Sequence, residues 1–252
     1  MASRSTEARQ ARAESRRARL AERAVEVVRP VLIDRVERDH LQTDAQFLRR
    51  RIVVAVTIVV GATLLGLSFS TEPGDSSFYP LTFGLAATWV IGSLASGPLH
   101  LGHIVFRSQT RRPIVTPIVV GLLLAAVFVV GGLITREIPP LARFTNDVLG
   151  YAKAGSLWLV VLVTLVNGVA EELFFRGALF AAIGRRHPVL ISTGLYALAT
   201  VAGGNPVLVF AAVILGLVTG LQRRAGGGVL APILTHVTWS TGMLLVLPHI
   251  FR

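Results

Sequence analysis

The stretch from Leu157 to Ala182 reads LWLVVLVTLVNGVAEELFFRGALFAA, which is long and apolar enough for a membrane-spanning helix. Inside it lie two carboxylates and a guanidinium, those of Glu171, Glu172 and Arg176. A charged side chain at bilayer depth costs about 2.5 to 3.5 kcal/mol on insertion scales, a cost that apolar residues would avoid. These three side chains are therefore candidates for function.

The spacing of the three charges separates their roles. Glu172 and Arg176 are four residues apart on one helix face, acid before base, so that they can neutralise each other. Glu171 is turned about 100° away and shares its face with Asn167 instead. We therefore interpret Glu172 and Arg176 as structural support, which leaves Glu171 free to act as a general base.

The whole chain has the composition of a membrane protein, because 52% of its 252 residues are hydrophobic and only 15% are charged. Seven apolar blocks are candidates to cross about 30 Å of hydrocarbon, the fifth and sixth being short and rich in glycine. The blocks are approximately residues 52–69, 78–101, 117–134, 157–182, 189–202, 206–221 and 230–247. The sequence thus predicts an all-α fold, a polytopic membrane helical bundle of about seven transmembrane helices.

Arginines flank these blocks in groups, and the groups predict the orientation of the bundle. Thirteen arginines precede Ile52, and the later groups are Arg107/Arg111/Arg112, Arg185/Arg186 and Arg223/Arg224. If all seven blocks cross, the four groups lie on one side, which the positive-inside rule assigns to the cytoplasm. We expect a multi-pass protein of a cell membrane, a bacterial plasma membrane, with a cytoplasmic N-terminus.

The chain divides into two parts by composition. Residues 1–51 form a basic cytosolic segment, helical or partly disordered, with a helix expected from Ser5 to Glu26, and residues 52–252 form the transmembrane domain. Topology and anionic lipid headgroups account for the formal net charge of +11, so we expect no nucleic-acid partner. The chain has no cysteine, which excludes disulfides and thiolate metal sites.

Few other polar side chains lie within the blocks, and they narrow the search for a site: Asn167, Tyr196, Thr200, His236, Trp239 and Ser240. His236 and Ser240 are four residues apart and share a helix face. At 1.5 Å per residue, Glu171 and His236 can both reach the cytosolic half of the bilayer. Tyr196 and Trp239 are interpreted as core residues or pocket walls.

The segment EELFFRG, residues 171–177, resembles the first motif, E-E-x-x-x-R, of the CAAX protease and bacteriocin-processing family, also called the abortive-infection family of intramembrane endopeptidases. In that family a second motif, F-x-x-x-H, follows on the next helix and a third, H-x-x-x-N, lies on a later one. Here the second reads YALAT, residues 196–200, and the third reads HVTWS, residues 236–240. Threonine replaces the second-motif histidine, and serine replaces asparagine. The family-like core covers residues 157–247.

The resemblance implies a role for each matching residue. Glu171 would activate a water molecule, and the second-motif residue, here Thr200, would assist it. Thr200 can orient a water molecule but cannot take up a proton at neutral pH. His236 and Ser240 match the positions that stabilise the developing oxyanion, and both can donate a hydrogen bond.

A catalytic metal is weakly supported by these residues. The family is often described as metallopeptidases, whereas a metal-free glutamate mechanism has also been argued. Zinc typically needs three protein ligands and an open position, and two acids with one matching histidine make a poor site. We therefore expect no cofactor, with zinc left open. His100 and His103, near the cytosolic end of the second block, are interpreted as structural.

The leading hypothesis is an intramembrane endopeptidase that cleaves a membrane-proximal peptide bond of a membrane protein or peptide with water activated by Glu171. The alternative is a non-catalytic family member, a pseudoenzyme acting as a peptide-binding adaptor or immunity-type factor, which Thr200 favours. A small transporter is a third class, weakened by the absence of a visible internal repeat.

Overall fold

The structure is a computed structural model that describes residues 16–19, 21–22, 25, 28–34, 42–106 and 109–251. Within these residues it is a helical bundle with one two-stranded hairpin. The helix expected from Ser5 to Glu26 falls largely outside the described residues. Residues 29–33 form one π-helical turn, η1, held near the end of a later helix by a hydrogen bond from Arg224 Nη2 to Leu32 O, 3.3 Å long.

Six helices in the described part of the chain are long and apolar enough to cross a membrane. They are α2 (Asp44–Phe69), α3 (Phe78–Ser96), α4 (Val115–Thr135), the continuous helix Leu157–Ile183, α9 (Pro206–Gly226) and α10 (Leu230–Ile250). The fifth predicted block forms the shorter helix α8 (Pro188–Val201), whose 14 residues span about 21 Å. The predicted polytopic membrane helical bundle is confirmed.

Two of the boundaries that differ from the sequence prediction have a clear local reason. Helix α2 begins eight residues before Ile52, because Thr43 and Gln46 form a capping box that starts the helix at Asp44. Helix α3 ends at Ser96 and not near residue 101, because Gly97 has a φ of 136°, which a helix cannot include.

His100 and His103 consequently lie on no helix, contrary to the expectation. Residues 100–103 run beside the turn between α9 and α10, where His103 N donates to Gly226 O at 2.9 Å and Val229 N donates to His100 O at 2.9 Å. The hairpin β1 (Ile104–Phe106) and β2 (Gln109–Arg111) follows directly. These contacts are made by the backbone of the two residues, and the structural role of their side chains stays a prediction.

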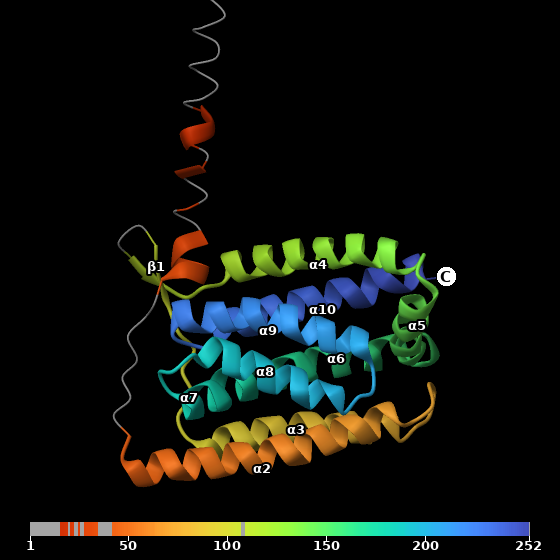
Figure 1. Cartoon of the computed structure of the whole chain (residues 1–252), viewed down its shortest axis with the longest axis horizontal. Coiled ribbons are helices and arrows are strands. Elements are labelled where there is room, and N and C mark those ends of the chain that lie inside the picture. Colours follow the sequence, from red (N-terminus) through yellow and green to blue (C-terminus); the bar gives the residue numbers. More distant parts are fainter. Residues whose placement is uncertain are drawn as a thin grey trace, which may run out of the picture.

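The connection between α4 and the continuous helix contains an additional helix, α5 (Pro139–Ala154), which lies outside the seven predicted apolar blocks. It lies across one end of the bundle (Figure 1). Tyr151 Oη donates to Phe69 O at 3.2 Å and also to Thr71 O, and Lys153 Nζ donates to Phe251 O at 2.8 Å. These contacts hold α5 against the ends of α2 and α10.

Among the described residues, the arginines that flank the bundle lie on or beside elements at the end opposite to α5 and the C-terminus, where the hairpin and the start of α2 lie (Figure 1): Arg49, Arg50, Arg51, Arg111, Arg112, Arg185, Arg186, Arg223 and Arg224. There Arg51 Nε donates to Ala182 O at 3.3 Å, and Arg112 Nη1 donates to Gly102 O at 2.6 Å. We call this the arginine end. The sequence predicts such an end, with the arginines on one side, if all seven apolar blocks cross the membrane.

Candidate active site

The continuous helix Leu157–Ile183 changes character immediately after the two glutamates. It is α-helical as α6 (Leu157–Glu172), π-helical as η2 (Leu173–Leu179) and α-helical again as α7 (Phe180–Ile183). A π segment widens the turn and leaves backbone carbonyls without regular partners, and such segments are frequent at functional sites. One of these carbonyls, Arg176 O, accepts a hydrogen bond from Arg223 Nε of α9 at 2.6 Å.

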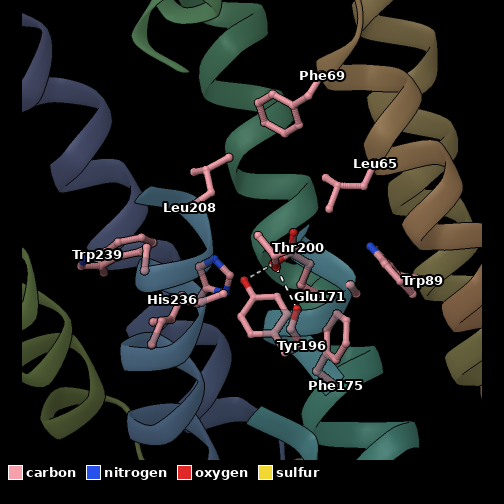
Figure 2. Close-up of a pocket in the computed structure, with 14 residues that line it drawn as sticks. Leu65, Phe69, Trp89, Glu171, Phe175, Tyr196, Thr200, Leu208, His236 and Trp239 are labelled. Carbon is pink, nitrogen blue, oxygen red and sulfur yellow. Dashed lines mark hydrogen bonds between the residues drawn. The ribbon is translucent and has the colours of Figure 1, made fainter. Parts of the chain in front are cut away.

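Glu171 lines a cavity of about 180 Å³ in the centre of the bundle. The walls come from α2, α3, the continuous helix, α8, α9 and α10: Leu65, Phe69, Trp89, Glu171, Phe175, Tyr196, Ala199, Thr200, Leu208, Ala211, Ala212, Leu215, His236 and Trp239. Most of these side chains are apolar, and the few polar groups converge near Glu171 (Figure 2). This is the usual make-up of a small-ligand or catalytic pocket.

The structure brings three of the four predicted catalytic residues to this one cavity. Glu171, Thr200 and His236 come from three different helices and all form part of its wall. Ser240 is not among the lining residues, and its hydroxyl donates to Val237 O on its own helix at 3.3 Å. The predicted face shared by His236 and Ser240 therefore brings only the histidine to the cavity.

Tyr196 makes the contact to Glu171 that the sequence analysis did not foresee. Its hydroxyl donates to Glu171 Oε2 at 2.6 Å, a length typical of a charge-assisted O–H bond (Figure 2). From the sequence alone, Tyr196 is expected to be a wall of the pocket or part of the core. The signal that could have found it is a hydroxyl at the position where the second motif of the family has phenylalanine.

Thr200 lines the cavity, but its hydroxyl proton is donated to the backbone of its own helix. Its hydroxyl donates to Tyr196 O, one turn earlier on α8, at 2.8 Å. Threonine in helices commonly makes this bond to the carbonyl four residues back. The oxygen of Thr200 can still accept a hydrogen bond from water, whereas its single donor is occupied.

Glu172 lies between a cation and the imidazole. Its Oε2 is 3.3 Å from Arg176 Nε, and its Oε1 is 2.9 Å from His236 Nδ1. Glu172 and Arg176 are fully buried, at 0% exposure. Because a carboxylate can only accept, Nδ1 carries the proton in this contact and Nε2 is left as the second functional nitrogen of the ring.

The donor set around Glu171 does not suit a metal ion. Glu172 already contacts Arg176 and His236, and Nδ1 of His236 faces that carboxylate. Across the described residues there is no group of three or more His, Cys, Asp or Glu side chains that could hold a metal. A catalytic zinc ion typically needs three protein ligands, so a reaction at Glu171 is expected to rely on the side chains of the protein alone.

The hydrogen bonds and ion pairs of Glu171, Glu172, Tyr196, Thr200 and His236 all fall within one stretch of the chain that matches a protein-family model. Residues 153–242 match the family model of the Rce1-like type II CAAX prenyl endopeptidases. This match confirms the resemblance seen in the motifs and covers about a third of the chain, from the end of α5 into α10. No curated protein and no solved structure matches the chain.

The match of this stretch to an Rce1-like family fits the other properties of the chain. The family consists of membrane endopeptidases, and the described residues contain six helices that can cross a membrane. The matched stretch holds Glu171, Thr200, His236 and Ser240 together with the buried pair Glu172 and Arg176. A multi-pass membrane protein with a protease-like core is the consistent description.

Proposed function

We propose that the protein is an intramembrane endopeptidase in which Glu171 activates the attacking water molecule. The observation that carries the proposal is the cavity wall shared by Glu171, Thr200 and His236 within the part of the chain that matches the Rce1-like family. A glutamate placed among mostly apolar walls is a costly arrangement unless it has a function. Hydrolysis of a peptide bond is the reaction that the family supports.

In the proposed reaction one residue, Glu171, acts first as the general base and then as the general acid. Glu171 removes a proton from water, the water oxygen attacks the scissile carbonyl carbon, and a tetrahedral oxyanion forms. The protonated Glu171 then gives that proton to the leaving nitrogen while the carbon–nitrogen bond breaks. The products are a new carboxyl terminus and a new amino terminus, so that one water molecule is consumed for each bond cleaved.

His236 is the better placed of the two candidate oxyanion donors. It lies on the cavity wall, and its contact with Glu172 fixes the orientation of the ring. A buried carboxylate at Nδ1 is the means by which many enzymes orient a catalytic imidazole. Ser240 is one turn further along α10 and would have to exchange its bond to Val237 O for one to the substrate.

The substrate class follows from the walls and from the location of the cavity. Leucine, alanine and aromatic side chains line most of the space above Glu171. Such walls suit an apolar segment of a membrane protein or a membrane-associated peptide. The arginine end would contact anionic lipid headgroups, which help to hold the protein at the membrane surface.

The experiment that tests this function compares new protein N-termini in membranes of cells that express either the wild type or Glu171→Gln at equal levels. Cleavages that depend on Glu171 are expected, because glutamine keeps the shape of the side chain and loses the base. Glu137→Gln is the matched control, since Glu137 is an exposed acid paired with Arg136. Identical sets of N-termini in all three membranes would contradict a protease and indicate a binding protein on the same fold.

A further inference from the structure

Tyr196 has no role in the reaction proposed above, although it contacts the base. It is 8% exposed, lines the cavity, and forms the hydrogen bond to Glu171 Oε2 described above. In the described part of the chain, no other side chain hydrogen-bonds the Glu171 carboxylate. Within the described residues, Tyr196 is thus the side chain that orients the proposed base by a hydrogen bond.

The ring of Tyr196 is held on two sides by the residues that follow the glutamates. The Phe175 ring centroid is 4.6 Å from its own, and the Arg176 guanidinium carbon is 4.8 Å from the ring centroid. Arg176 is itself fixed by Glu172 at 3.3 Å. A cation over an aromatic face is attractive, so the buried ion pair also fixes the direction of the phenol.

The neighbouring residue of the second motif cannot make this contact. The Thr200 hydroxyl donates to Tyr196 O and has no second proton to offer Glu171. The pair Tyr196 and Thr200 thus differs from an F-x-x-x-H pair in which motif position contacts the Glu171 carboxylate. The hydroxyl that reaches the carboxylate lies at the first position of the motif and not at the fifth.

We infer that Tyr196 is a positioning residue for the Glu171 base and takes over the support that the missing second-motif histidine would give. The inference rests on the proposed function of Glu171. By donating to Oε2, the phenol fixes the plane of the carboxylate and leaves Oε1 to receive the water proton. A base held in one orientation reacts from a larger share of its conformations than a base that rotates.

A rate experiment tests the exchange of roles between the two positions. Wild type, Tyr196→Phe, Thr200→His and the double variant are reconstituted as full chains in liposomes with a quenched fluorogenic peptide that ends in a farnesylated cysteine and three further residues. Tyr196→Phe is expected to lower kcat about 10- to 100-fold with little change in KM, because a bond to a charged group is lost and the ring shape stays. The double variant is expected to recover about 10-fold of that loss.

The double-mutant cycle separates a positioning role from a merely structural one. If Tyr196 positions the base, Thr200→His raises kcat much more in the Tyr196→Phe background than in the wild type. Equal effects of Thr200→His in both backgrounds would overturn the inference, and so would an unchanged kcat in Tyr196→Phe. Tyr151→Phe is the control, since it removes another hydroxyl that bonds to backbone carbonyls outside the cavity and is expected to keep kcat.

A second measurement does not depend on activity. The carboxyl infrared band of Glu171 is identified in liposomes by its loss in Glu171→Gln, and the same subtraction is repeated in the Tyr196→Phe background. A shifted band is expected, because the phenol no longer donates to Oε2. An unmoved band would overturn the inference even where cleavage is lost. If neither the wild type nor Thr200→His cleaves the peptide, this peptide is not a substrate; the comparison of N-termini in membranes then decides the proposed function, and this band alone decides the inferred contact.

Discussion

Glu172 has a structural task in addition to orienting His236. It is fully buried and contacts both the Arg176 guanidinium and the His236 imidazole. Burial of an ion pair yields little net stability, because desolvation offsets most of the attraction. Removing one partner is costly nevertheless, since the remaining charge stays buried without compensation.

Glu172→Gln is therefore expected to reduce the free energy of unfolding by about 3 to 5 kcal/mol, because Arg176 is left as an uncompensated buried cation. Denaturant or thermal unfolding of the purified protein in detergent measures the loss. Glu137→Gln, at an exposed pair, is the control and should cost less than about 1 kcal/mol.

The same reasoning predicts partial recovery in a double variant. Glu172→Gln combined with Arg176→Met removes both charges, and replacing a buried pair by apolar groups is often neutral. A double variant as unstable as Glu172→Gln alone would show that the glutamate acts through His236 and not through the arginine.

The sequence predicted Glu171 and the buried charges because charged residues in an apolar helix have few explanations. It could not predict which polar side chains reach the cavity. Ser240 shares a helix face with His236 but bonds to Val237 O, and the Thr200 hydroxyl bonds to Tyr196 O. Rotamers of hydroxyl side chains depend on the surrounding packing, and that packing is not visible in a motif.

At the scale of elements, α2 and α3 form one wall of the site through close helix contact. A β-carbon at Gly61 of α2 would lie 2.1 Å from the Trp89 ring of α3, and real contacts are never this short. Trp89 in turn packs on Phe174 at 4.6 Å and on Phe175 at 5.1 Å between ring centroids. The glycine thus sets the position of a cavity wall.

Gly61→Ala is expected to displace Trp89 and to destabilise the protein by about 1 to 3 kcal/mol through overpacking. Gly84→Ala is the matched control, because it lies inside α3 and a β-carbon there meets nothing within 4 Å. The control should be neutral or stabilising by up to about 1 kcal/mol from helix propensity. Unfolding curves of both variants give the comparison, and equal stabilities would contradict the close contact.

The apolar blocks predicted most helices well, because length and hydropathy decide whether a segment crosses a membrane. The fourth block, residues 157–182, matches the helix Leu157–Ile183 within one residue. The π segment Leu173–Leu179 was not predicted, since the residues that widen a turn have no composition of their own. Helix α5 was also missed, because it is amphipathic: charged and polar residues on its other face prevent a long apolar block.

At the scale of the whole molecule, the cavity extends away from the arginine end. His236 lies in the half of α10 nearer the arginine end, whereas Phe69 is the last residue of α2 and Leu208 lies in the first turn of α9. The last two positions are near the end that α5 covers (Figure 1). The orientation of the bundle therefore decides which membrane face lies nearer to the apolar part of the site.

The orientation can be measured directly, because the chain has no native cysteine that would react. Exposed single sites are Ser76→Cys in the loop before α3 and Arg186→Cys at the arginine end. In intact cells a membrane-impermeant maleimide is expected to label Ser76→Cys, and to label Arg186→Cys only after permeabilisation, because arginine-rich ends stay in the cytoplasm. The reverse pattern would show that the bundle is inverted.

The short helix α8 provides the sharpest test of the seven-crossing arrangement. Ala202→Cys is exposed just beyond its last residue, Val201, at the far end of the bundle from Arg186. Although its 14 residues span only about 21 Å, the helix has buried neighbours on several sides, and a thinner local bilayer can accommodate it. Labelling of Ala202→Cys in intact cells, like that of Ser76→Cys, is the expected result. Protection of Ala202→Cys until permeabilisation would place both ends of α8 on one side of the membrane and would contradict the seven-crossing arrangement.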